Sequence, residues 1–248
     1  MKFQLVSGLH LEKYKRLPPL YKLITPSAPN LILAGNICFA KHKHFVPFFE
    51  QIAPLFERIF FILGNNEYYN KGCEAEMFSA KENCIINSLS HLKNIKILQK
   101  DYIKLDNDIV IIGLTLWSYI SRRDLVGETT YLTDPKYILY KGTLIPTPTI
   151  TNRIHLIQKQ WLKDMLELFS QMRIIVVTHH LPSFCCVLNK HDMNNKFLYS
   201  NCDELIKSTT AWCAGHIYVC MDKNINGVPV YINSLGSLLK NNGYIYIE

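Results

Sequence analysis

The chain has no apolar run near the length of about 18 residues that a membrane-spanning helix needs. Its first apolar segment, residues 3–6, is too short for the core of a signal peptide, and no cleavage site follows it. The eight cysteines form no CxxC pair, which disfavours a zinc ribbon, and without a secretion signal we expect reduced, mostly buried thiols. Low-complexity segments and linkers are also lacking. We therefore expect one domain, residues 1–248, located in the cytoplasm.

Acidic residues are fewer than basic ones, and the formal net charge is +7. Lysine outnumbers arginine 21 to 6, and isoleucine and asparagine are abundant. An AT-rich genome, such as that of a large DNA virus or an intracellular bacterium, would produce this composition. If the source is viral, the expected location is the host cytoplasm. The basic excess alone thus leaves nucleic-acid binding open without favouring it.

Apolar periodicity predicts an α/β protein in which strands and helices alternate. The segment 118–151 is mixed in composition and is expected to be irregular with one short helix. In the second of the predicted helices, Met77, Phe78, Ile85, Leu89 and Leu92 are expected to face inward. Strands are predicted at residues 3–6, 31–34, 59–63, 95–98, 102–105, 109–114, 173–177, 211–214, 228–233 and 244–247, and helices at 44–56, 73–92 and 154–172. The natural architecture is two packed sheets with helices outside.

Five short polar blocks follow apolar runs, where loops at the carboxyl ends of strands would place them on one edge of a sheet. They are Ser7-Gly8-Leu9-His10, Gly35-Asn36, Gly64-Asn65-Asn66-Glu67, Thr178-His179-His180 and Gly215-His216-Ile217-Tyr218. Histidine and asparagine dominate these blocks, and carboxylates are nearly missing from them.

In order and spacing, the blocks resemble those of the calcineurin-like metallophosphoesterases, which read Asp-x-His, Gly-Asp, Gly-Asn-His-Glu, a His after a strand, and Gly-His-x-His. The segments at residues 113–118 (GLTLWS) and 178–183 (THHLPS) look like those of a small bacterial and viral subgroup. The resemblance covers nearly the whole chain. It implies an α/β fold, a four-layer αββα sandwich of two mixed sheets.

By this resemblance, one of the family's two metals is expected to be lost. Its ligand positions correspond to Gly8, His10, Asn36 and Tyr218. Glycine offers no side-chain ligand, and a tyrosine hydroxyl with a reference pKa of about 10 is a poor one. His10 is then a remnant of this site.

The second metal position maps to Asn65, His179 and His216, together with Asn36 at the bridging position. These side chains keep the family's ligand positions but include no negatively charged carboxylate. They could hold one Zn, Mn or Fe ion weakly. The alternative is that each side chain hydrogen-bonds its own loop. A site rebuilt from Cys38, Cys185, Cys186 or Cys220 is also conceivable, because thiolates bind zinc.

No catalytic residue is assigned, because the position of the family's candidate proton donor is Asn66. An amide cannot donate a proton, and loss of general acid–base help costs about 10²–10⁴-fold. The expectation is a pseudoenzyme with little phosphoester hydrolysis that binds a protein partner. One alternative is a weak single-metal phosphoesterase acting on a nucleotide or phosphoprotein. Another is a nucleic-acid-binding protein, for which binding should weaken with salt.

Overall fold

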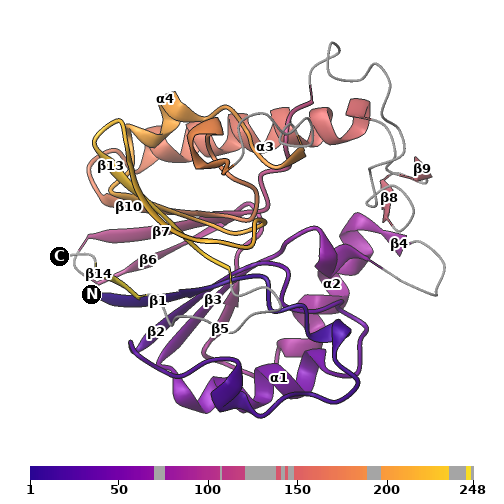
Figure 1. The fold of residues 1–248 in the computed structure, drawn as a ribbon. Helices are drawn as coiled ribbons and strands as arrows, with labels where there is room; N and C mark the ends of the chain where they lie inside the picture. Colours follow the sequence, from indigo (N-terminus) through magenta and orange to yellow (C-terminus); the bar gives the residue numbers. More distant parts are fainter. Residues whose placement is uncertain are drawn as a thin grey trace.

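The computed structural model describes residues 1–69, 76–106, 108–120, 138–140, 143–144, 148–188, 197–234 and 244–246. Within them, two mixed β-sheets lie between outer helices, α1 and α2 on one side and α3 and α4 on the other (Figure 1). The predicted αββα sandwich is confirmed. No helix of the described residues is long and apolar enough to cross a membrane.

The first sheet has the strand order β14-β1-β2-β3-β5. The strands β1, β2, β3 and β5 are parallel, and β14 pairs antiparallel with β1 at the edge. The helices α1 and α2 cover the outer face of this sheet. The bounds are β1 Lys2–Val6, β2 Asn30–Ala34, α1 Phe45–Ile52, β3 Arg58–Ile62, α2 Phe78–Leu89, β5 Ile95–Ile97 and β14 Tyr244–Tyr246.

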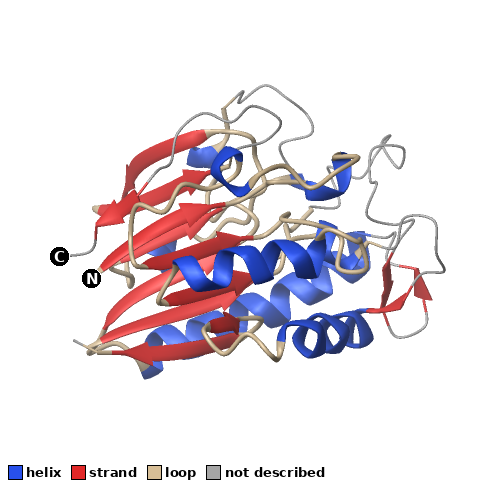
Figure 2. Ribbon diagram, turned by 90° about the horizontal axis from the view of Figure 1, so that it is seen from below, coloured by secondary structure: helices blue, strands red, loops and turns tan. Residues whose placement is uncertain are grey.

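The second sheet has the order β12-β13-β11-β10-β7-β6, with parallel strands in the middle and an antiparallel strand at each edge. The helices α3 and α4 pack outside it, and Figure 2 shows the layers from below. The bounds are β6 Asp101–Leu105, β7 Ile109–Leu114, α3 Pro148–Leu168, β10 Arg173–Thr178, α4 Asp203–Ile206, β11 Ala211–Ala214, β12 Cys220–Ile225 and β13 Val228–Asn233.

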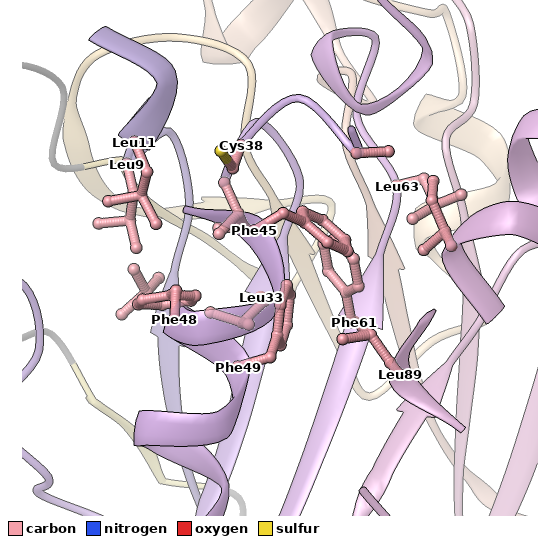
Figure 3. Close-up of a cluster of buried hydrophobic side chains, with 14 of the residues drawn as sticks. Leu9, Leu11, Leu33, Cys38, Phe45, Phe48, Phe49, Phe61, Leu63 and Leu89 are labelled. Atoms are coloured by element: carbon pink, nitrogen blue, oxygen red, sulfur yellow. The ribbon is translucent and has the colours of Figure 1, made fainter. Parts of the chain in front are cut away.

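Three apolar clusters fill the spaces between the four layers. One lies between the first sheet and its helices, where Phe45 and Phe49 of α1 pack on Phe61 of β3 (Figure 3). Another joins the two sheets, with Phe60 from the first and Ile175 from the second among its members. The third lies under α3. Burial on both faces explains why the central strands are continuous apolar runs.

Several predicted boundaries are wrong. The second helix begins at Phe78, because Met77 lies in the short strand β4 (Glu76–Met77), which pairs with β8 (Ile138–Tyr140). Its predicted start, Cys73, lies outside the described residues. Of the five side chains expected inward, Ile85 and Leu89 are buried, while Phe78 and Leu92, which follows the helix, are partly buried.

The segment expected to be irregular contains β8 and β9 (Thr143–Leu144), which form an antiparallel pair, and the first turn of α3. The helix α3 starts at Pro148 and not at residue 154, since proline suits the first turn of a helix. Of the predicted turn at residues 106–108, residue 107 lies outside the described residues.

The strand β12 was missed entirely. It is an edge strand with alternating exposure and several polar residues, so it carries no apolar run. The signal that could have found it is Asn226-Gly227, where both residues have positive φ. This dipeptide is the typical two-residue turn of a β-hairpin, and here it joins β12 to β13.

Candidate metal centre

Loops at one end of the two sheets bring four of the five blocks to the wall of a cavity of about 600 Å³. His10, Asn36, Asn65, Asn66, His216 and Tyr218 line it. The fourth block, Thr178-His179-His180, reaches the others through His179, which lies 3.0 Å from both Asn65 and His216. The sequence-predicted residues thus lie together, contributed by loops from both sheets.

Close packing of the backbone explains the glycine of the third block. A Cβ atom at Gly64 would lie 2.5 Å from Oδ1 of Asn36 and 2.8 Å from Cε1 of His179. A larger residue at position 64 would therefore push Asn36 of the second block and His179 of the fourth block away from the third.

Glu67 ties the second and third blocks together. Its carboxylate accepts hydrogen bonds from the backbone N–H groups of Gly64, Asn36, Ile37 and Cys38, at 2.6–3.3 Å. Complete burial raises the pKa of Glu67 to about 7, and the four N–H groups oppose that shift. The motif alone does not reveal this role, since only a structure shows which N–H groups donate hydrogen bonds to a carboxylate.

Asn65, His179 and His216 form a compact donor trio. Nδ1 of His179 lies 2.8 Å from the carbonyl oxygen of Ala34, so this nitrogen carries the ring proton. Burial lowers the pKa of His179 well below its usual value, so the ring is neutral. Its Nε2 lone pair then faces Oδ1 of Asn65 and Nδ1 of His216, each at 3.0 Å.

The other two members of the trio also present acceptor atoms. Asn65 donates through Nδ2 to the hydroxyl of Tyr69 at 2.8 Å, which leaves Oδ1 directed at His179. Burial lowers the pKa of His216 to about 4, while a hydrogen bond with the Phe197 backbone opposes the shift. Three lone-pair atoms that converge in this way repel one another unless a proton or a cation lies between them.

This trio fits one divalent cation. Two ligands of one tetrahedral zinc lie about 3.3 Å apart when each bond is about 2.0 Å long. The Ala34 carbonyl fixes the orientation of His179, as an outer partner of a metal-binding histidine does. Among the residues that the structure describes, no comparable set is available for a second cation. Asn36, at the bridging position, uses its Oδ1 to accept from the backbone N–H of Asn66 at 3.0 Å.

The remnant His10 takes part in a separate network. Its Nε2 lies 2.8 Å from the hydroxyl of Tyr218, and its Nδ1 lies 2.9 Å from Glu12 and 2.8 Å from Asn66. Both ring nitrogens therefore have protein partners. Glu12, two residues after His10, is a carboxylate at this cleft that the sequence analysis did not assign.

The position of the first aspartate of the family is closed. Gly8 has a φ of +63°, and a Cβ atom there would lie 2.3 Å from the side-chain oxygen of Ser234. The cysteines build no substitute: among the described residues, no three His, Cys, Asp or Glu side chains group in a way that could hold a metal. Burial also raises the pKa of Cys38 and Cys186, which keeps these thiols protonated.

Comparison with known proteins agrees with the fold. The calcineurin-like phosphoesterase profile matches residues 1–220, and the chain belongs to this family, whose members typically bind divalent metals. It is 26% identical over 239 residues to protein L509 of Acanthamoeba polyphaga mimivirus, covering 88% of this chain and 83% of that protein.

Two solved structures share the fold at low identity. The phosphopantetheinyl hydrolase of Mycobacterium tuberculosis is similar with a TM-score of 0.74 and 15% identity, covering 95% of this chain and 89% of that one. A dimetal phosphatase from Danio rerio is similar with a TM-score of 0.54 and 12% identity, covering 97% and 89%. At these identities the likeness shows the fold alone.

Proposed function

We propose that this protein is a pseudoenzyme of the metallophosphoesterase fold, with little or no phosphoester hydrolysis, which acts by binding a protein partner. The observation that carries the proposal is the network around His10. At the first metal position of the family, a ring nitrogen of this histidine is bonded by Tyr218, and Gly8 has no space for a carboxylate beside Ser234.

The charge of the cleft supports the same proposal. A two-metal centre concentrates about four positive charges, which need anionic ligands in a desolvated site. Burial lowers the pKa values of His179 and His216, so both rings are neutral near pH 7. Asn36, Asn65 and Asn66 are neutral amides. Such a set has nothing with which to bridge two cations and offers no proton donor to a leaving group.

The donor trio favours one alternative, a weak single-metal phosphoesterase acting on a nucleotide or phosphoprotein. Asn65, His179 and His216 would hold the cation, which could be Zn, Mn or Fe and would act as a Lewis acid when bound. The chain itself would contribute orientation through Ala34 and Tyr69, which fix the ring of His179 and the amide of Asn65.

Hydrolysis of an activated phosphodiester with added manganese tests the two functions. The unmodified protein should be at background. Repair by Gly8→Asp, Asn36→Asp, Asn66→His and Tyr218→His, with Ser234→Ala to make room, should give two-metal binding and measurable turnover. Each substitution alone should do far less, because residues that act as a unit are not additive.

The matched control is His179→Ala in both backgrounds. If the unmodified protein turned over well and His179→Ala abolished that turnover, the pseudoenzyme proposal would be wrong. The single-metal phosphoesterase would then replace it.

A further inference from the structure

A second cavity, of about 440 Å³, lies between α2, the segment after β5, and α3. These helices belong to opposite outer layers of the fold (Figure 1). Four of the residues that line the cavity are apolar: Phe78 of α2, and Ile154, Ile157 and Trp161 of α3. The volume is that of a small-molecule site, and polar side chains of Glu82, Gln99, Lys100 and Gln158 stand beside the apolar ones.

One of these polar groups is the amide of Gln158. The residue is 1% exposed, and its Oε1 accepts from the backbone N–H of Trp117 at 3.0 Å. This bond fixes which end of the amide points inward. The amide nitrogen has no hydrogen-bond partner among the described residues, and the residue lines the cavity. A ligand acceptor in the cavity would receive a hydrogen bond from this N–H group.

The second polar group is the carboxylate of Glu82. Tyr68 donates to its Oε1 at 2.8 Å, and Gln99 donates in turn to the Tyr68 hydroxyl at 2.9 Å. A carboxylate has room for further donors after one such bond. Burial raises the pKa of Glu82, while hydrogen bonds from Tyr68 and Gln99 and the charge of Lys100 oppose the shift.

Gln158 and Glu82 therefore place a donor and an acceptor beside the aromatic side chains of this cavity. Phe78 is stacked on Tyr68 with ring centroids 3.9 Å apart, which holds its ring in place. Trp161 is partly buried against the core under α3. A flat ring with an amino group beside a ring nitrogen would match Glu82 with its donor and Gln158 with its acceptor.

We propose that this cavity is a binding site for an amino-substituted heteroaromatic ring, of which adenine and cytosine are the common biological cases. Glu82 accepts from the exocyclic amine, Gln158 donates to the adjacent ring nitrogen, and Phe78 and Trp161 contact the ring. The site is separate from the metal cleft and does not depend on the proposed function. The short helix η4 (Asn66–Tyr68) lies between the two, with Asn66 at the cleft and Tyr68 bonded to Glu82.

Two ligand pairs test the hydrogen-bond pattern. Adenosine and inosine, and likewise cytidine and uridine, differ by an exchange of amine for carbonyl that inverts donor and acceptor. Titration is followed by tryptophan fluorescence, since Trp161 lines the cavity while Trp117 and Trp212 are buried. The amino member of each pair should bind at least about tenfold more tightly, which is the discrimination of one well-placed pair of bonds.

Adenosine monophosphate distinguishes a nucleotide from a nucleoside as the natural ligand. Lys100 lines the cavity and is exposed, so it could pair with a phosphate. Tighter, salt-sensitive binding of the monophosphate would identify a nucleotide. Equal binding of adenosine and its monophosphate would identify a nucleoside or free base. Either result supports the amino-heterocycle proposal.

Variants of the two polar groups provide the second test. Glu82→Gln keeps an acceptor for Tyr68 but can turn an amide N–H₂ toward the ligand, so the preference for adenosine over inosine should fall to about unity or reverse. Gln158→Met should weaken adenosine binding about tenfold and leave inosine nearly unchanged. Glu50→Gln, an exposed carboxylate on α1, is the matched control and should change neither. Thermal unfolding of each variant confirms that it is folded.

Equal binding of amino and carbonyl members by the unmodified protein would mean a merely apolar cavity and would overturn the proposal. So would the absence of any nucleoside binding at millimolar concentration. A preference for adenosine that survives Glu82→Gln in a folded variant would also overturn it, because the selectivity would then arise elsewhere.

Discussion

The hydroxyl of Tyr218 lies 2.8 Å from Nε2 of His10, and the two rings are tilted with centroids 5.5 Å apart. By its motif, Tyr218 stands where the family's Gly-His-x-His block has its last histidine, and its hydroxyl contacts a ring nitrogen of His10. The tyrosine remains 60% exposed. The contact therefore lies at the solvent-exposed wall of the cleft and is not part of the apolar core.

Gly8→Asp alone should destabilise the protein by about 1–3 kcal/mol. The new Cβ would meet the Ser234 oxygen, and a φ of +63° strains a residue with a side chain. Ser234→Ala alone should be neutral or slightly stabilising, because that buried oxygen has no hydrogen-bond partner among the described residues. In a double-mutant cycle by urea unfolding, the pair should recover at least about 1 kcal/mol. Strict additivity would contradict the contact.

As purified, the protein should hold at most one divalent ion per chain, and substoichiometrically. The donor trio has two imidazoles and an amide oxygen, and no carboxylate neutralises the cation. Elemental analysis after dialysis measures the content, and zinc titration measures the affinity. His216→Asn should abolish the binding, whereas His10→Asn, the matched control in the same cleft, should leave it unchanged. Two tightly held ions would defeat the assignment.

The layers and the order of the blocks could be predicted because central strands buried on both faces read as apolar runs, and each block directly follows one. Residues 31–34 and 59–63 are examples, matching β2 and β3 almost to the residue. The edge strands β12 and β4 escaped because they lack that signal. The strand β12 alternates exposed and partly buried residues, and β4 is only two residues long.

The residues of the candidate site could be predicted from the sequence, but the contacts between them could not. The sequence marked His10 as a retained family position and Tyr218 as a departure from the family pattern, yet only the fold brings these residues, 208 positions apart, into hydrogen-bond range. Ser234 beside Gly8 and the four N–H groups around Glu67 were likewise invisible. Such contacts depend on loop geometry from several strands, for which a single sequence carries no periodic signal.

Glu67→Gln should destabilise the protein by about 1–3 kcal/mol. The carboxylate receives four backbone N–H groups, and an amide would turn its own N–H₂ toward two of them, leaving buried donors unpaired. Urea unfolding at pH 8 measures the change. Glu50→Gln, the exposed control, should change stability by less than about 0.5 kcal/mol. Equal effects of the two substitutions would show that Glu67 does not tie the loops together.

Stability should fall as the pH drops from about 6.5 to about 4, in part because of His155. Burial lowers the pKa of this residue to about 4, while its Nδ1 donates to the carbonyl oxygen of Trp117 at 2.7 Å. Between these pH values His155 binds a proton in the unfolded chain but not in the folded chain, so acid favours unfolding.

The contribution of His155 is up to about 3 kcal/mol, since one pKa unit corresponds to about 1.4 kcal/mol. His155→Asn keeps a donor for Trp117 without titrating, so its unfolding free energy should depend less steeply on pH between about 4 and 6.5. The other buried histidines, His179, His180 and His216, titrate in the same direction and leave a residual slope. An identical slope in the His155 variant and the unmodified protein would show that His155 is protonated in the folded state as readily as in the unfolded chain.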